Sequence, residues 1–287
     1  MVKLLAVLGC AALGACAHAP PPGPHPLAGR IWDAHAGVFI PPEELFARAA
    51  RAHDIVLGET HDNAEHHRLQ LAVLEALAAR GRVRLLAMEQ FDSEYQSAID
   101  TARSSSADAE ALADAGHFER KGWNWPLYRP LVQFALDHGW PLGAANLSRV
   151  EARAIVGDPA RSGLIPAPAL AEALARDIVE GHCGAAPEPK RLAGMIEAQR
   201  ARDARMAQVL AALGQRGSVL IAGIGHARRD RGVPLYLGER ALMSIAFMEV
   251  QDGTTSPQQY FDGFASPTSF DYLWFTRRAE RDDPCGQ

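Results

Sequence analysis

Acidic and imidazole side chains stand at the ends of three apolar runs in this sequence, where they could do acid–base or metal chemistry. Glu59 and His61 follow the first run, Glu89 ends the second, and His226 follows the third. Two carboxylates and two imidazoles that converge could bind a divalent metal ion with an open coordination position. They could equally serve as a general acid–base group. Both kinds of chemistry require the four side chains to meet.

The apolar runs are predicted to be strands, so that each of these side chains lies at a strand end. Residues 55–59 are apolar and β-branched up to Gly58, and a helix capped by Asp62 or Asn63 should follow. Residues 84–89 and 219–223 have the same buried character. Ligand sites of open α/β sheets lie at the carboxyl ends of the strands. We therefore expect the four side chains to share one rim of a sheet.

Three further polar residues are expected near this rim. Asn146 ends another predicted strand, 141–146. In the predicted helix 190–213, Gln199 and Asp203 occupy positions of the apolar stripe, which repeats in steps of three and four. Because buried polar side chains need hydrogen-bond partners, these two either bond the backbone or face a polar pocket.

The order of the elements predicts the fold class. Apolar strands alternate with long helices rich in Ala and Leu, which favours an α/β domain over residues 30–287 with a mostly parallel sheet flanked by helices and a large helical insertion. A charged fraction of 22% and an apolar fraction of 48% are ordinary for a globular protein. The net charge of −5 argues against nucleic acid as a partner.

The first 29 residues predict export and anchoring to a membrane. Residues 1–16 have a short positive start and an apolar core, as in a secretory signal peptide, and end in Leu13-Gly14-Ala15-Cys16, which resembles a bacterial lipobox. Cys16 would then carry the lipid. The alternative is an ordinary cleaved signal without lipid. Residues 17–29 are Pro-rich and predict a tether that holds the domain off the membrane of a bacterial cell envelope, facing the periplasm or the cell surface.

Two cysteines remain after this segment. In an exported protein an even pair suggests a disulfide, here between Cys183 and Cys285, which would pin the C-terminal tail. No HExxH, Gly-x-Ser-x-Gly or phosphate-loop motif is present, so zinc-protease, serine-hydrolase and nucleotide-binding interpretations lose support.

Several short blocks of this sequence are weak singly and specific together. They are Gly58-Glu59-Thr60-His61-Asp62-Asn63, His67, Gln70, Glu89, 123–128, 198–207, 222–230 and Gly232-Val233-Pro234. In consistent order over roughly residues 30–285, this set resembles the ChaN-like haem-binding uptake lipoproteins of the Tiki superfamily.

This resemblance implies haem handling during iron uptake, and a dimer with two stacked haems between subunits. It also implies a Tyr ligand to the iron, helped by a His from the partner subunit. Tyr128 has the most haem-like neighbourhood, beside Trp123 and Trp125 and followed by Arg129, and Tyr95 is the second candidate. The alternative for Tyr128 is an aromatic corner that only packs.

Relatives of the Tiki and erythromycin-esterase type imply a different function, a metal-dependent hydrolysis. They resemble this chain in a Gly-x-x-His after the first strand and another near the end, here Gly58 to His61 and Gly223 to His226. Glu59 or Glu89 would activate water. The haem-binding lipoprotein remains the leading hypothesis and the hydrolase the alternative. A third class is a non-catalytic envelope interaction module, if the polar cluster is only internal bonding.

Overall fold

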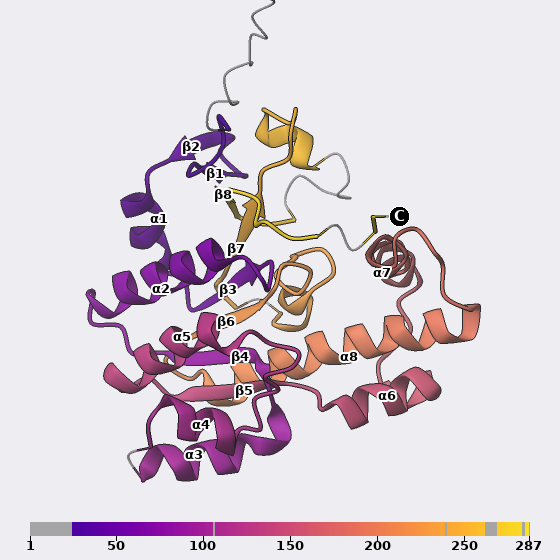
Figure 1. Ribbon diagram of the computed structural model, residues 1–287, viewed down its shortest axis with the longest axis horizontal. Helices are drawn as coiled ribbons and strands as arrows, with labels where there is room; N and C mark the ends of the chain where they lie inside the picture. The colour runs from indigo at the N-terminus through magenta and orange to yellow at the C-terminus, as the bar shows by residue number, and fades with distance from the viewer. Residues whose placement is uncertain (1–24, 106, 239, 262–268, 283–284, 287) are drawn as a thin grey trace, which may run out of the picture.

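An eight-stranded sheet with helices on both faces organises the computed structural model, which describes residues 25–105, 107–238, 240–261, 269–282 and 285–286 (Figure 1). The strand order is β2-β1-β8-β7-β3-β6-β4-β5. The strands are β1 (Ile31–Asp33), β2 (Val38–Ile40), β3 (Asp54–Glu59), β4 (Leu85–Asp92), β5 (Leu142–Asn146), β6 (Ser218–Gly223), β7 (Leu242–Glu249) and β8 (Tyr272–Thr276). The helices are α1 (Pro42–Ala49), α2 (Ala64–Ala78), α3 (Gln96–Ser104), α4 (Ala109–Ala115), α5 (Trp125–Asp137), α6 (Arg149–Gly157), α7 (Pro168–Gly181) and α8 (Pro189–Leu213).

The centre of the sheet is parallel, as the alternation of strands and helices predicts. β3 pairs in parallel with β6 on one side and β7 on the other, and β4 pairs in parallel with β6 and β5. Only β1 pairs in an antiparallel manner among the described strands, with β2 and β8. The predicted α/β class with a mostly parallel sheet is confirmed. Because Glu59 pairs with Gly223 in this register, the ends of β3 and β6 are side by side.

Two apolar cores fill the space between the sheet and its helices. Residues of α1 to α5 pack on one face, with Leu74, Phe91 and Leu131 fully buried there. On the other face α8 packs Met206 and Leu210 against the sheet, together with the segments that follow β6 and β7. The sheet therefore carries apolar side chains on both faces, which explains its near-continuous apolar strands.

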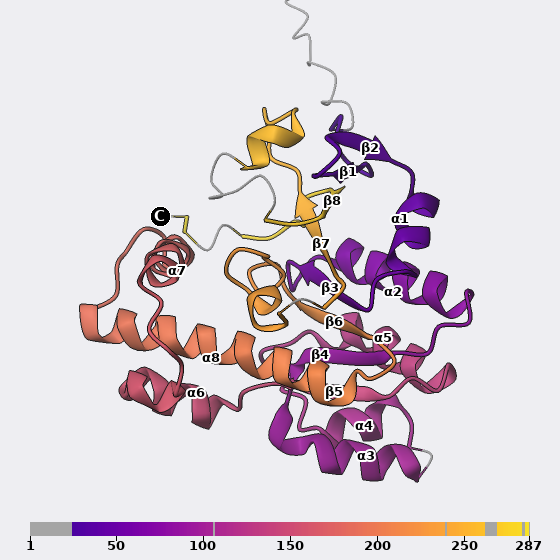
Figure 2. The same cartoon turned by 180° about the vertical axis from the view of Figure 1, so that it is seen from behind.

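The large helical insertion consists of α6, α7 and the first half of α8, which extend away from the sheet in both ribbon views (Figure 2). A small core of Leu147, Ile155, Ala198 and Ala201 joins α6 to α8. The two helices approach so closely at Gly194 that a Cβ there would lie 2.1 Å from the carbonyl oxygen of Val156. A glycine is required at this crossing.

The ends of the chain differ in part from the expectation. Leu27, which the sequence places in the tether, is only 2% exposed and belongs to a core, so the folded part begins before residue 30. The predicted signal peptide and the lipidation site Cys16 lie outside the described residues. In the part of the chain that is described, no helix combines the length and apolarity of a membrane span. Cys183 and Cys285 form a disulfide, which ties the segment after α7 to the C-terminal tail.

Candidate functional site

Glu59 lies buried at the end of β3 and makes polar contacts with residues of α2, α5 and β4. The preceding residue, Gly58, lies close to the turn after β6, because a Cβ on it would be 2.7 Å from the Cβ of Ala227. Glu59 is 1% exposed. Its carboxylate accepts hydrogen bonds from the Tyr128 hydroxyl (2.6 Å), the Gln70 amide (2.6 Å) and, over 3.4 Å, the Gln90 amide, and it contacts Nδ1 of His61 (3.0 Å).

A second carboxylate, Glu89, lies at the neighbouring strand end. One oxygen of Glu89 accepts the backbone N–H of Gly223 at 2.8 Å, and the other is 3.3 Å from Nε2 of His226. The opposite ring nitrogen of His226, Nδ1, is 2.6 Å from Asp203 on α8. His226 is thus held between two carboxylates. The Gln199 amide also contacts the His226 ring, at 3.2 Å.

The two carboxylate clusters adjoin at Gly223. A Cβ built on Gly223 would lie 3.0 Å from Cε1 and Nε2 of His61 and 3.7 Å from the Glu89 carboxylate, so the His61 ring packs over this glycine. Trp123 contacts the same ring edge-on, with centroids 4.7 Å apart. The four residues predicted to meet at the strand ends, Glu59, His61, Glu89 and His226, therefore do so.

The electrostatics of the second cluster are dominated by buried charge. Burial alone would lower the pKa of His226, but Glu89 and Asp203 outweigh it and raise the pKa to about 10. Burial would raise the pKa of Glu89, yet His226, His61 and the Gly223 N–H lower it to about 2. Burial prevails at Asp203, whose pKa rises to about 6 although His226 opposes the shift. At neutral pH the structure thus holds an imidazolium ion against the Glu89 carboxylate.

His61 is the part of the site that solvent reaches. Its side chain is 45% exposed, whereas that of Glu59 is fully buried. Burial lowers the pKa of His61, but the hydrogen bond to Glu59 and the charge of Glu89 raise it overall. Since Glu59 contacts Nδ1, the Nε2 atom remains on the side of Gly223. The arrangement can move a proton at Nε2.

Asn146 also lies at this rim but has a positioning role. Its amide donates to the backbone carbonyl of Glu89 at 3.0 Å, and its side-chain oxygen accepts from Arg202 at 3.2 Å. Gln199 and Asp203 of α8 contact the His226 ring. They therefore face the polar site, which was one of the two expected alternatives, and do not bond the backbone of the core.

The predicted metal site is not supported. Among the described residues no group of three or more His, Cys, Asp or Glu side chains is placed to hold a metal ion. The physical reason is that the donor atoms are already paired: Glu59 with Tyr128 and Gln70, and both nitrogens of His226 with carboxylates.

The predicted haem residues separate in space. Tyr128 is fully buried in α5, and its hydroxyl donates to Glu59. Burial and the charges of Glu59 and Glu89 raise the pKa of Tyr128, so the phenol stays neutral. Arg129 points away, to an ion pair with Glu110 at 3.4 Å on the protein surface.

Tyr95 has the surroundings that were expected of Tyr128. It lines a hollow of about 500 Å³ beside the strand ends, which also includes Glu89 and Trp123. Its ring stacks on His117 with centroids 4.1 Å apart. Arg149 and Arg202 also line this hollow, Arg149 in an ion pair with Glu119 at 2.7 Å, and the carboxylates of Asp92 and Glu94 lie beside them. We call this the Tyr95 hollow.

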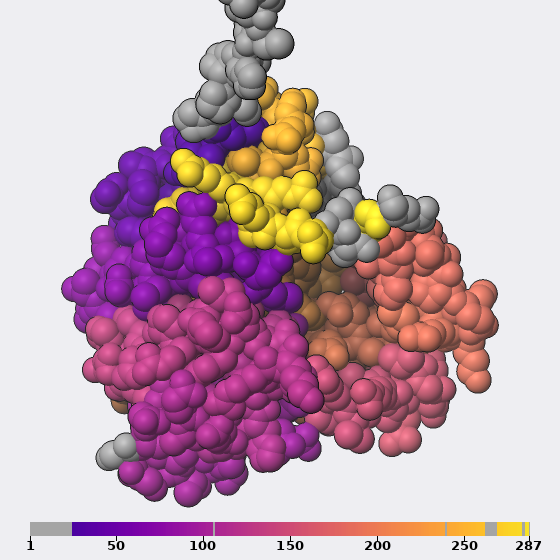
Figure 3. All heavy atoms as spheres, viewed as in Figure 1, coloured from indigo at the N-terminus to yellow at the C-terminus, as the bar shows by residue number. Residues whose placement is uncertain are grey.

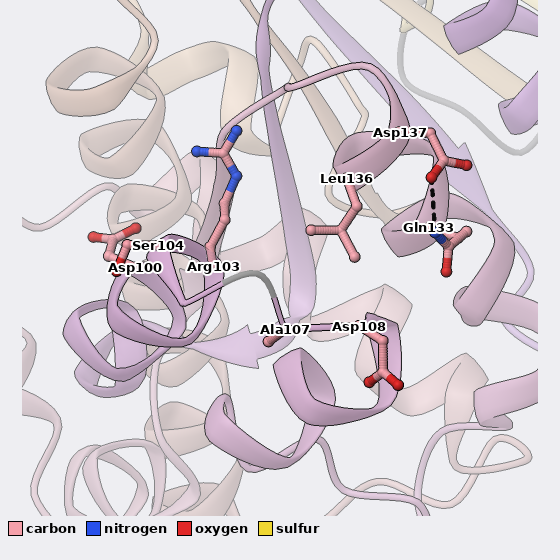
Figure 4. A pocket seen from close by; sticks show the side chains of 8 residues that line it. All are labelled: Asp100, Arg103, Ser104, Ala107, Asp108, Gln133, Leu136 and Asp137. Atoms are coloured by element: carbon pink, nitrogen blue, oxygen red, sulfur yellow. Dashed lines mark hydrogen bonds between the residues drawn. The ribbon is translucent and has the colours of Figure 1, made fainter.

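A separate hollow of about 590 Å³ lies between α3, α4 and α5 (Figure 4). Asp100 and Arg103 line it from α3, and Gln133 and Asp137 from α5, where the Gln133 amide donates to Asp137 at 2.8 Å. It contains none of the strand-end residues and is not part of the candidate site.

Sequence reasoning gave no site role to Gln70, Gln90 or Arg202, nor to the hydroxyl of Tyr128 as a donor to Glu59. Gln70 had a usable signal, because it is a polar residue on the buried face of α2, next to the apolar Leu69 and Val73. Gln90 had no such signal, since it lies inside a strand that is buried on both faces.

The fold and the strand-end cluster define a mostly parallel α/β protein with acidic and imidazole groups converging at one rim. The family model described as "Haem-binding uptake, Tiki superfamily, ChaN" matches residues 45–237, and the chain belongs to this family. The resemblance in the sequence is thereby confirmed. Comparison with curated proteins gives no significant match.

Two solved structures are similar in fold. ChaN of Campylobacter jejuni, described with cofacial haem binding, is 24% identical, with a TM-score of 0.72 over 85% of this chain and 95% of that one. The erythromycin esterase EreC, as the H289N mutant in its open conformation, is 13% identical, with a TM-score of 0.51 over 85% of this chain and 95% of that one. At these identities the likeness shows the fold alone.

Proposed function

We propose that this chain is a lipid-anchored haem-binding protein of the bacterial cell envelope, facing the periplasm or the cell surface, that takes part in haem and iron uptake. Membership of a family described as haem-binding uptake supports the binding part. The lipobox-like segment ending at Cys16 supports the anchor. The observation that carries the proposal is the Tyr95 hollow, which offers what a haem needs next to the strand ends.

The residues of the Tyr95 hollow fit haem by their chemistry. Haem requires an axial ligand, apolar or aromatic walls, and cations or donors for its propionates. Tyr95 supplies a phenol, Trp123 and His117 supply rings, and Arg202 supplies a cation, whereas Arg149 is already paired to Glu119 at 2.7 Å. Bound haem would bring a redox-active iron to this hollow, while the residues of the chain bind and orient it.

Tyr95 rather than Tyr128 is the proposed ligand. The Tyr128 hydroxyl is committed to Glu59 inside the core, and freeing it would leave that buried carboxylate short of a donor. Tyr95 is half-buried and opens to the hollow. Partial burial and the charges of Glu94 and Asp92 raise the pKa of Tyr95. Binding that requires the phenolate should therefore strengthen as the pH rises.

A haem titration of the purified protein tests this assignment. We expect the Soret band to shift on binding and Tyr95→Phe to abolish the shift. Tyr128→Phe is the matched control, because it removes a buried hydroxyl without altering the hollow. Loss of the shift in Tyr128→Phe with retention in Tyr95→Phe would overturn the ligand assignment. Sedimentation with and without haem would test the homodimer that we propose along with it.

The lipid anchor has its own test. In bacterial cells labelled with radioactive palmitate, we expect the wild-type chain to become labelled and to fractionate with membranes. Cys16→Ser should lose both properties. Labelling that persists in Cys16→Ser would contradict lipidation at this residue.

A second candidate function is hydrolysis by proton transfer at His61. The half-exposed ring beside two buried carboxylates favours it. Nε2 of His61 would take a proton from water as the water attacks a carbonyl, and would return it to the leaving group, while Glu59 orients Nδ1. With a panel of ester and amide substrates, activity of the wild type that His61→Ala removes would support it. Equal rates in both proteins would exclude it.

A further inference from the structure

A groove of about 320 Å³ lies between α6 and α8 in the helical insertion, whose surface Figure 3 shows at the right of the molecule. On each helix the residues that line the groove are three or four positions apart, so that one face of each helix forms one wall. Ligand pockets measure about 300–1,000 Å³, so the groove can hold a small molecule. We call it the α6–α8 groove.

Three arginines line the α6–α8 groove, and among the described residues no carboxylate lines it. Arg149 of α6 is already paired to Glu119 at 2.7 Å. Arg153 of α6 is exposed and forms no ion pair within the described part of the chain. Arg202 of α8 donates to the neutral side-chain oxygen of Asn146 at 3.2 Å. Two of the three guanidinium groups therefore have no carboxylate in contact with them.

Nearby carboxylates reduce this positive charge without pairing to it. Burial raises the pKa of Asp92 and of Asp203, and the charge of Arg202 opposes the rise through space. Asp203 is itself bonded to the imidazole of His226 at 2.6 Å. The groove therefore keeps an excess of positive charge, which is greatest at Arg153.

The rest of the wall of the α6–α8 groove is apolar. Val156 of α6 and Met195 of α8 are only partly buried, so their side chains leave apolar surface open to the groove. Covering such surface is favourable by about 25 cal/mol per Å². The thioether side chain of Met195 can also adapt its shape to an aromatic ring. A ligand that combines an anionic group with an apolar one would use both parts of the wall.

The α6–α8 groove adjoins the candidate site. Gln199 lines the groove, and its amide contacts the His226 ring at 3.2 Å. Arg202 lines both the groove and the Tyr95 hollow. A ligand in the groove would therefore lie beside the strand ends without occupying the position next to Tyr95.

We propose that the α6–α8 groove binds a small phosphate monoester with an apolar organic group. Arg153 and Arg202 bind the phosphate, and Val156 and Met195 contact the organic group. A phosphate monoester carries a charge of about −1.5 to −2 at pH 7, which suits two guanidinium groups better than the single charge of a carboxylate or a sulfate ester. This site goes beyond the proposed haem function and does not depend on it.

Phenyl phosphate is the probe for this site. It would be titrated calorimetrically into the purified protein, with its disulfide intact, in a buffer of low ionic strength without phosphate. We expect binding with a dissociation constant of about 1 mM or below. Phenyl sulfate has the same ring but a single charge, and it should bind about tenfold more weakly.

A pair of variants at Met195 tests the charge of the groove. Met195→Glu adds a carboxylate to the wall and should weaken the binding of phenyl phosphate about tenfold or more. Met195→Gln is the matched control, because its side chain has the same length and a similar helix propensity but no charge. It should bind within about threefold of the wild type.

Removing one cation tests the role of Arg153. Arg153→Gln should weaken the binding of phenyl phosphate about tenfold. Arg216→Gln should leave it unchanged, since Arg216 is an exposed arginine that follows the far end of α8 and does not line the groove.

The proposed haem function and this proposal can fail separately. Tyr95→Phe should bind phenyl phosphate as the wild type does, even where it loses the haem Soret shift. Four results would overturn the proposal: no binding of phenyl phosphate, equal affinity in Met195→Glu and Met195→Gln, an affinity that Arg153→Gln leaves unchanged, or phenyl sulfate that binds as tightly as phenyl phosphate.

Discussion

His66 and His226 are both buried beside the strand ends, yet one imidazole is neutral at pH 7 and the other is a cation. His66 is 0% exposed, accepts the Thr60 N–H on Nδ1 at 2.9 Å and donates from Nε2 to the Thr276 hydroxyl at 2.8 Å. Burial lowers its pKa to about 4. His226 is 6% exposed but is flanked by two carboxylates, which raise its pKa to about 10.

The difference teaches that burial alone does not decide the charge of an imidazole. Burial disfavours the cation in both rings, and the two carboxylates in direct contact with His226 reverse the outcome there. Neutral His66 therefore joins the turn after β3 to β8 through two ordinary hydrogen bonds. Cationic His226 instead fixes a positive charge beside Glu89, within the candidate site.

Removing the buried cation should have the largest effect on stability. His226→Gln leaves Glu89 and Asp203 buried without their counter-charge, so we expect the free energy of unfolding at pH 7 to fall by about 3–5 kcal/mol. Urea unfolding of both proteins measures this loss. A loss below about 1 kcal/mol would mean that the two carboxylates are not charged in the folded protein.

The charge of His226 should determine how the free energy of unfolding changes between neutral and alkaline pH. Its pKa is raised from 6.5 to about 10, so its contribution is fully present below pH 6.5 and is lost as the pH rises towards 10. The gap in stability between wild type and His226→Gln should therefore narrow from pH 7 to pH 10. A gap that stays constant over this range would contradict the assigned charge.

The neutral state of His66 should contribute to how the free energy of unfolding changes between neutral and acid pH. Its pKa is lowered from 6.5 to about 4, so its contribution is present above pH 6.5 and is lost as the pH falls towards 4. His66→Phe leaves the Thr60 N–H and the Thr276 hydroxyl without their hydrogen-bond partner. It should lower the free energy of unfolding at pH 7 by about 1–3 kcal/mol. The cost should shrink between pH 6.5 and pH 4, in contrast to the alkaline effect at His226. A cost that grows on acidification would refute the neutral assignment.

The sequence was sufficient to predict the strand ends and their convergence, because apolar runs that stop at Gly58 and Gly223 leave little choice of register in a parallel sheet. It could not predict which polar atoms pair. The same four residue types suit a metal ion or a hydrogen-bonded network, and only the distances distinguish them.

Side-chain direction was the other limit. Tyr128 and Arg129 are consecutive in the sequence, but successive helical residues are rotated by about 100°, so one faces Glu59 and the other the solvent. The aromatic cluster therefore suggested a haem pocket where the structure has a core. Tyr95 lies within a 3-10 turn (Ser93–Tyr95) after β4, and local pattern gave no reason to rank it above Tyr128.

The smallest loss of stability in this comparison is expected on changing Asn63, which holds the start of helix α2, where His66 lies, and does not contact His226. Its side-chain oxygen accepts the Glu65 N–H at 2.9 Å and caps α2, and its amide donates to Glu249 at 2.6 Å. Asn63→Ala should lower the free energy of unfolding by about 1–2 kcal/mol, as measured in urea.

Asp108→Ala is the matched control for a cap, since Asp108 caps the exposed start of α4 through the Ala111 N–H at 2.8 Å, and we expect about 1 kcal/mol there. Because the Asn63 amide helps to lower the pKa of Glu249, Asn63→Ala should also flatten the acid side of the profile, while Asp108→Ala should shift the whole profile evenly. Neither variant touches His226, so the alkaline side should keep its wild-type slope in both. A change of that slope in Asn63→Ala would show that the two histidines are coupled and that the contrast between them is not a local one.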